Sequence, residues 1–260
     1  MKVCAGPLWN TSEIWNSTDP DFTKCFHDVV LPSIPLCYLV LLIPIEIYFM
    51  RKSVARPIPF GVTNLLRSFG ILLLLGPSVV LLSSRLTENR DIEELADVIH
   101  PSVEILSFMI ALILNIANIR RGVCSSGIVF GFWTLTFISQ SLTYISVIRF
   151  ESECIRLVLT FVKHALISAV YFSHFFADQP RDSAGYEVLD AGKPSPYLTS
   201  SFPSKLVFLW MTPYLFKGWK NPLKREDLWD LTDSVKSSTV YANWKKTWEK
   251  LSSHASGKQK

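Results

Sequence analysis

Five long apolar blocks dominate the first two thirds of the chain, separated by short polar stretches. Their approximate bounds are 31–50, 62–83, 99–119, 128–148 and 157–177. Each holds about 20 residues, which as a helix crosses the roughly 30 Å of hydrocarbon in a bilayer. The pattern predicts an all-α integral membrane protein, with a tail over residues 1–30, a bundle of five transmembrane helices over 31–177 and a further segment over 178–260.

The positive charges around these blocks predict an orientation. Arg51 and Lys52 directly follow the first block, and Arg120 and Arg121 follow the third. Residues 178–260 hold 13 basic and nine acidic residues, and this surplus equals the whole net charge of +4. Because Lys and Arg are concentrated in cytoplasmic loops, we expect a cytoplasmic C-terminus. Five spans then place the N-terminus outside the cell or in a lumen.

The tail over residues 1–30 carries features typical of an extracellular or lumenal segment. Asn10 and Asn16 each begin an Asn-x-Ser/Thr acceptor sequence for N-glycosylation. In an oxidising compartment Cys4 and Cys25 can form a disulfide that closes a loop of about 20 residues, worth roughly 3 kcal/mol. Cys154 is expected on the same side and could compete, and free thiols throughout are the other alternative.

Several polar residues lie inside the apolar blocks, where an ionised side chain is costly unless it is paired or reaches the interface. They are Glu46, Arg67, Glu104, Asn115, Asn118, Gln140, Lys163 and His164. One interpretation is a path for a transported substrate. We favour the other, in which these groups reach the headgroups or form interhelical pairs that orient the bundle, because no block carries a repeated stripe of charge.

The motifs of several enzyme and binding classes are missing from the sequence. There is no Gly-x-x-x-x-Gly-Lys-Ser/Thr loop for nucleotide phosphates, no Gly-x-Ser-x-Gly elbow and no His-Glu-x-x-His or Cys/His cluster. We therefore predict no enzymatic activity, no cofactor and no metal in this chain. A net charge of +4 is too small to indicate nucleic-acid binding.

Residues 178–260 read as a cytoplasmic linker that begins with a polar, flexible connector. The apolar run from Leu206 to Phe216 is too short to span a bilayer. We expect a short helix over about 203–212, ended by Pro213, and flanking basic residues such as Lys205 and Lys217 suit an anionic membrane surface.

A second helix is predicted to begin near Ser234. Tyr241, Trp244, Trp248 and Leu251 recur at spacings of three and four residues, which places them on one helical face. Residues 252–260 are small and polar and are expected to be disordered. Both apolar surfaces of the linker predict contact with a membrane or with another protein.

Three segments resemble the multidrug-resistance-associated branch of the ABC transporters, the C subfamily. The tail segment reads Trp-Asn-Ser-Thr-Asp-Pro-Asp-Phe-Thr-Lys-Cys-Phe over 15–26, and Ser-Ser-Gly-Ile over 125–128 opens the fourth block. In the linker, Ser-Phe-Pro-Ser-Lys over 201–205, Trp-Met-Thr-Pro over 210–213, Lys-Gly-Trp over 217–219 and Asp-Leu-Trp over 227–229 resemble the family's lasso-forming segment.

The resemblance implies an accessory five-span N-terminal domain followed by a linker that docks on the transporter core over about 200–231. By the same resemblance Cys4 and Cys25 form the disulfide and Asn10 and Asn16 carry glycans. The docking residues it implies are Phe202, Lys205, Trp210, Pro213, Lys217, Trp219 and Trp229. The core spans and both nucleotide-binding domains would lie beyond Lys260, so ATP-driven export of organic anions and conjugates is implied only for a complete transporter.

We expect the chain to serve in targeting, retention, docking or regulation of a transporter core, without transport alone. The expected partners are membrane lipid and that core, in cis or in trans, with an ion channel or a trafficking protein as further candidates. The plasma membrane is the expected location, and a vacuolar or lysosomal membrane is the alternative. The competing hypotheses are a self-contained small channel or carrier, a channel-regulatory subunit, and an incomplete gene product without a separate role.

Overall fold

A computed structural model describes residues 4, 6–15, 20–52, 61–87, 95–123, 126–150, 154–176, 195–197, 200–224, 227–229 and 236–257. The described residues form helices and connecting turns and no β-strand. The chain divides into two compact units. The first comprises Met1–Arg181 with Ser201–Pro203, and the second comprises Asp182–Ser200 with Ser204–Lys260.

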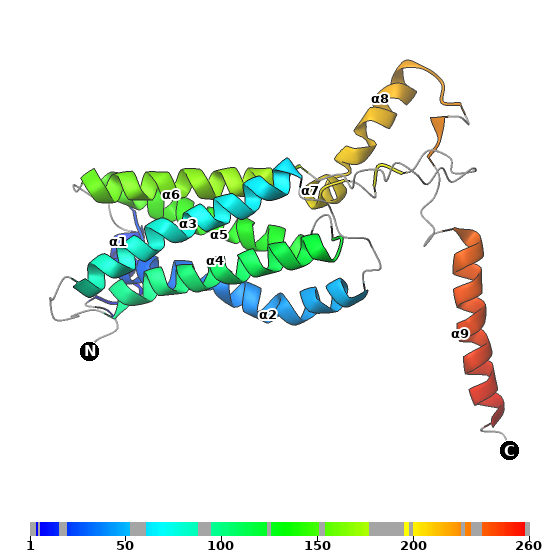
Figure 1. The fold of residues 1–260 in the computed structure, drawn as a ribbon, viewed down its shortest axis with the longest axis horizontal. Coiled ribbons are helices and arrows are strands. Elements are labelled where there is room, and N and C mark those ends of the chain that lie inside the picture. Colours follow the sequence, from blue (N-terminus) through cyan, green and yellow to red (C-terminus); the bar gives the residue numbers. More distant parts are fainter. Residues whose placement is uncertain are drawn as a thin grey trace. The chain divides into compact units, whose positions relative to one another are not determined.

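The first unit is a bundle of long apolar helices that lie side by side (Figure 1). A short helix α1 (Thr11–Trp15) and a π-helical turn η1 (Phe26–Val30) precede them. The long helices are α2 (Leu31–Lys52), α3 (Val62–Thr87), α4 (Ala96–Arg120), α5 (Gly127–Phe150) and α6 (Cys154–Ser173). All five lie where the apolar blocks predicted helices.

The helices pack around an interior of large apolar side chains. Helix α3 contacts α4 and α6, and α5 contacts α2 and α6. Phe108, Phe132 and Trp133 are almost completely buried at the centre, with the parallel rings of Phe108 and Trp133 6.1 Å apart. Large aliphatic side chains such as Leu41 and Leu65 point outward and are exposed. An apolar exterior around a packed interior is expected of a bundle solvated by lipid.

Four of the five predicted spans are long and apolar enough to cross a membrane. They are Phe26–Lys52, Val62–Ser84, Ala96–Arg120 and Gly127–Phe150. The fifth predicted block corresponds to α6, in which the apolar stretch Leu157–Ser173 is shorter than the length required of a span. The prediction is wrong about the end of this block, because the helix stops at Ser173 and residues 174–176 form turns.

The second unit contains the linker helices. Helix α7 (Phe202–Leu206), which begins in the first unit, is followed by a 3-10 turn η2 (Leu209–Met211) and by α8 (Thr212–Lys220) and α9 (Ser237–Gly257). The predicted helix over 203–212 is confirmed at its start and wrong beyond Leu206, because Phe208 adopts a left-handed conformation (φ 56°) that breaks it. Pro213 begins a helix instead of ending one, since the first helical turn needs no backbone N–H from proline.

Helix α9 confirms the predicted amphipathic helix and corrects its end. It begins at Ser237 and continues to Gly257, so residues 252–257, predicted to be disordered, are helical. Tyr241, Trp244 and Trp248 line one face and are each more than half exposed, and the rings of Trp244 and Trp248 stack with centroids 5.7 Å apart. Most of the predicted flexible connector, residues 178–194 and 198–199, lies outside the described residues.

Candidate functional site

A buried carboxylate joins four helices inside the bundle. Lys163 Nζ of α6 lies 2.7 and 2.6 Å from the two carboxylate oxygens of Glu104 on α4. Gln140 of α5 donates to Glu104 Oε1 at 2.7 Å, and Ser78 of α3 donates to Oε2 at 3.0 Å. His100 Nε2, one helical turn before Glu104, lies 3.3 Å from Oε1. These contacts satisfy both carboxylate oxygens.

This network distinguishes headgroup contact from interhelical pairing, the two forms of the interpretation favoured for Glu104 and Lys163. Neither side chain reaches the headgroups, because both are buried and hydrogen-bonded to each other. The interhelical-pair interpretation therefore holds for them. The sequence pointed to Glu104, Gln140 and Lys163 as unusual, but it gave no sign that Ser78 and His100 belong to the same cluster.

A small cavity of about 130 Å³ adjoins this network. Charged and polar side chains line it, among them Lys24, Asp28, Asp97, His100 and Lys163. His100 Nδ1 lies 3.8 Å from Asp28 Oδ1. Apolar residues such as Leu81 and Val147 form much of the remaining wall, and the cavity has room for a few water molecules. His100 thus links Asp28 to Glu104, and through Glu104 to Lys163, in one chain of charged and titratable side chains.

A second polar cluster lies at the other end of the bundle. Asn118 of α4 donates to Glu46 Oε1 of α2 at 2.8 Å. Arg67 of α3 donates to the backbone carbonyl oxygen of Ser173 at 2.7 Å and also to that of Phe176. The last carbonyl groups of a helix lack intrahelical hydrogen-bond donors, and Arg67 supplies donors to them at the end of α6.

Apolar side chains separate the two polar clusters. Along α4, Glu104 and Asn118 are about 21 Å apart at 1.5 Å per residue. Phe108 and Ala111, which lie between them, are buried, as is Ile167 of α6. Ser107 and Asn115 of α4 are buried in the same stretch, so the interior between the two clusters is mainly but not wholly apolar.

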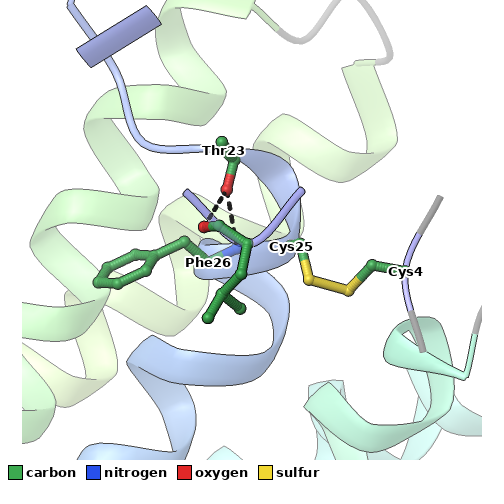
Figure 2. The surroundings of a disulfide bond; sticks show 5 residues. Cys4, Thr23, Cys25 and Phe26 are labelled. Atoms are coloured by element: carbon green, nitrogen blue, oxygen red, sulfur yellow. Dashed lines mark hydrogen bonds between the residues drawn. A yellow bond between two sulfur atoms is a disulfide. The ribbon is translucent and has the colours of Figure 1, made fainter. Parts of the chain in front are cut away.

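The N-terminal tail packs on the helices of the first unit, to which it belongs. Cys4 and Cys25 are joined, with their Cα atoms 5.8 Å apart, and Figure 2 shows this bond beside Thr23. Thr23 Oγ1 donates to the carbonyl of Leu8 at 2.8 Å. Asn10 precedes α1 and is partly exposed, whereas Asn16 lies outside the described residues.

Asp21 ties the tail to the bundle. Ser146 of α5 donates to Asp21 Oδ2 at 2.5 Å, His27 Nε2 lies 3.1 Å from Oδ1, and the Phe22 amide donates to Oδ1 at 2.8 Å. Partial burial disfavours the charged carboxylate, but the hydrogen bonds from Ser146, His27 and the Phe22 amide outweigh it and hold the pKa of Asp21 below its usual value.

Phe202, the first of the predicted docking residues, packs on the bundle. Its ring lies over Gly127, the first residue of α5, and its centroid is 5.8 Å from that of Phe130. A Cβ atom on Gly127 would lie 2.6 Å from the Phe202 ring, so any side chain here would displace the ring. Phe202 was predicted to be a docking residue, but its contact with Gly127 was not predicted.

The second unit brings four of the other predicted docking residues into contacts within the linker. The Trp210 and Trp229 rings lie 5.8 Å apart, and Tyr214 lies 4.8 Å from Trp229. Sequence reasoning missed Tyr214, although its spacing of four residues from Trp210 places both on one helical face.

Tyr197 extends this aromatic cluster. It lies 5.6 Å from Trp210, and Lys205 Nζ lies 4.9 Å above the Tyr197 ring in a cation–π contact. Lys217 Nζ binds Asp227 Oδ1 at 2.5 Å. Trp219, by contrast, is 80% exposed. The linker thus has an internal aromatic cluster and an exposed apolar surface.

The comparisons with known proteins agree with this architecture. A family model described as the ABC transporter TMD0 domain matches residues 8–171. ATP-binding cassette sub-family C member 3 of Rattus norvegicus is 26% identical over 97% of this chain, which covers 17% of that protein. ATP-binding cassette sub-family C member 2 of Mus musculus is 26% identical over 94% of the chain, which covers 16% of that protein.

The matching family model describes a membrane domain and not an enzyme. The chain spans about one sixth of the length of the curated relatives it matches. The similarity extends past the bundle into the linker, since it includes nearly the whole chain. With the apolar helices described above, the match identifies a multi-pass membrane protein. The chain belongs to the ABC transporter TMD0 domain family, in the N-terminal region of the C subfamily.

Proposed function

We propose that the chain is the accessory N-terminal membrane domain and linker of a multidrug-resistance-associated ABC exporter of organic anions and conjugates. It docks on the transporter core and contributes to its targeting, retention or regulation. The observation that carries the proposal is the apolar face of α9, where Tyr241, Trp244 and Trp248 are each more than half exposed. Aromatic surface of this extent is typical of a protein-docking site.

The proposed topology has five spans, with the N-terminus outside and the C-terminus in the cytoplasm. Helix α6 has 20 residues, about 30 Å, and packs against α3 and α5, which are both long enough to cross the membrane. A helix that packs along two spanning helices and buries Ile167 and Val170 between them is expected to share their depth. We place residues 1–30 outside, with glycans on Asn10 and Asn16 and a disulfide between Cys4 and Cys25.

Glycan mapping in cells tests this topology. Removal of N-linked glycans should increase the gel mobility of the wild-type chain. The single variants Asn10→Gln and Asn16→Gln should each lose one step of that shift, and the double variant should lose it all. A wild-type chain that carries no glycan when expressed in a mammalian secretory pathway would contradict the outward N-terminus.

Co-purification tests the docking function. The full chain is expressed with a separate fragment of rat ATP-binding cassette sub-family C member 3 that lacks the matching N-terminal region. The full chain should be recovered with this fragment, and a chain that ends at residue 199 should not. Within α9, Trp244→Ala with Trp248→Ala should reduce recovery at least tenfold.

The matched control is Asn243→Ala with Thr247→Ala, which removes exposed polar side chains at the same spacing on the same helix. This control should leave recovery unchanged. Recovery of the truncated chain equal to that of the full chain would show that the bundle, and not the linker, makes the contact. Equal losses in the aromatic and polar variants would refute the role of the aromatic face.

A further inference from the structure

An apolar groove of about 490 Å³ lies between the C-terminal ends of α2 and α4. Both helices end at the same end of the bundle (Figure 1). Isoleucines line the groove, with Ile47 on α2 and Ile113 on α4, and three arginines stand at its end: Arg51, Arg120 and Arg121. The side chain of Ile113 is 60% exposed, so the groove opens to the outside of the bundle.

The groove lies where a membrane changes from hydrocarbon to headgroup. Both α2 and α4 are apolar helices of spanning length, and Arg51 and Arg120 lie in their last turns. The isoleucines, one or more helical turns earlier, are therefore at the depth of acyl chains, and the guanidinium groups are at the depth of phosphates. Among the described residues no carboxylate forms an ion pair with Arg51 or Arg120, and both side chains are exposed.

We propose that this groove binds an anionic phospholipid, with an acyl chain along the isoleucines and the phosphate groups on the arginines. A planar guanidinium binds phosphate through two parallel hydrogen bonds, and basic pockets between membrane helices suit lipid headgroups that carry several negative charges. Phosphoinositides provide such a headgroup. This inference requires only that α2 and α4 span the membrane, and it does not depend on docking to a transporter core.

The same features argue against the other occupants of an apolar groove. A second copy of the chain, related by a twofold axis, would bring the same three arginines face to face. A soluble peptide would have to enter from the side where the isoleucines face lipid. The apolar wall and the cationic end are both satisfied by one lipid molecule.

Native mass spectrometry of the purified full chain tests the proposal. The chain is delipidated in detergent and then mixed with phosphatidylinositol 4-phosphate or with phosphatidylcholine of the same acyl chains. The phosphoinositide should be retained at least tenfold more strongly. Each arginine at the membrane surface contributes of order fivefold to this preference, so Arg51→Gln with Arg120→Gln should weaken phosphoinositide retention by about 25-fold.

Two further variants distinguish a built site from general surface charge. Lys52→Gln with Arg149→Gln removes the same charge from exposed positions that do not line the groove, and it should keep retention within about twofold of the wild type. Ile113→Trp fills the groove without a change of charge and should reduce phosphoinositide retention about tenfold.

Three results would overturn the proposal. They are equal retention of the two lipids, an equal loss in the groove and control charge variants, and normal retention by Ile113→Trp. A dimer that disappears in Ile113→Trp while lipid retention persists would identify a second copy as the occupant. Because Arg51, Arg120 and Ile113 are exposed, their substitution should leave the fold intact.

Discussion

Replacement of Lys163 by methionine would leave the Glu104 carboxylate buried without its cation. The two groups are in contact at 2.6 and 2.7 Å, and their side chains are 9% and 3% exposed. At an effective dielectric constant of 20 the Coulomb attraction at 2.6 Å is about 6 kcal/mol, which is an upper bound because both ions lost hydration on folding. Removal of one partner of such a pair typically costs 3–5 kcal/mol.

Glu104 keeps three other contacts after this change, from Ser78, Gln140 and His100. We therefore expect Lys163→Met to lower the free energy of unfolding by about 3 kcal/mol, the lower end of that range. The double variant Glu104→Gln with Lys163→Met removes the uncompensated charge and keeps an acceptor for Gln140. It should be more stable than Lys163→Met alone.

Unfolding of the full chain in mixed micelles of mild detergent and dodecyl sulfate, followed by circular dichroism, measures these differences. Lys245→Met is the matched control, because Lys245 is 58% exposed and lies 4.0 Å from Glu249. It should change stability by less than about 0.5 kcal/mol. If Lys163→Met is as mild as this control, or if the double variant is no more stable than Lys163→Met, the pair does not hold the helices together.

Three further changes test the contacts of the first unit. Gly127→Ala should destabilise the chain by about 1–3 kcal/mol because its Cβ meets the Phe202 ring, and Phe202→Ala in the same chain should recover part of the loss in thermal unfolding. Cys4→Ser should lower the free energy of unfolding by about 3 kcal/mol. The wild type should be equally unstable once its Cys4–Cys25 disulfide is reduced. Asp21→Asn should destabilise the chain at pH 6, and the difference from the wild type in paired thermal melts should shrink as the pH falls below 3.8. A carboxylate with a lowered pKa stabilises the fold fully above its unfolded pKa and loses that contribution as pH falls through its folded pKa.

The sequence was sufficient to predict the helices because lipid imposes a simple rule on them. A spanning segment must satisfy its own backbone hydrogen bonds and present apolar side chains over about 20 residues, so the blocks and the helices nearly coincide. The first block, predicted over 31–50, is helical over Leu31–Lys52. The end of the fifth block was predicted wrongly, since apolar character continues to Ala177 while the helix ends at Ser173.

Contacts between helices could not be predicted in the same way. Glu104 and Lys163 are 59 residues apart in the chain, and each is an isolated polar residue in an apolar block. Their pairing depends on the rotation of two helices about their axes, which the weak amphipathicity of lipid-exposed helices does not fix. The same holds for Phe202, whose ring can pack on the start of α5 because residue 127 has no side chain.

The linker shows a different reason for failure. One short helix was predicted over about 203–212, ended by Pro213, because proline usually interrupts a helix. The chain instead turns at Phe208 and starts α8 at Thr212, with Pro213 in its first turn. Local rules for proline depend on where a helix starts, and here the left-handed residue Phe208 sets that point.

The arrangement of polar groups indicates where this domain can act. The carboxylate of Glu104 takes four partners inside the bundle, and Arg67 binds the carbonyl groups at the end of α6. Groups already engaged in this way stabilise the bundle and leave little capacity for a transported solute. The side chains that remain available lie on surfaces, at the aromatic face of α9 and at Arg51 and Arg120 at the ends of α2 and α4. Substitutions in the interior should therefore change the amount of folded protein, whereas substitutions on these surfaces should change what it binds at unchanged amount. Expression level and binding, measured on the same set of variants, separate the two classes.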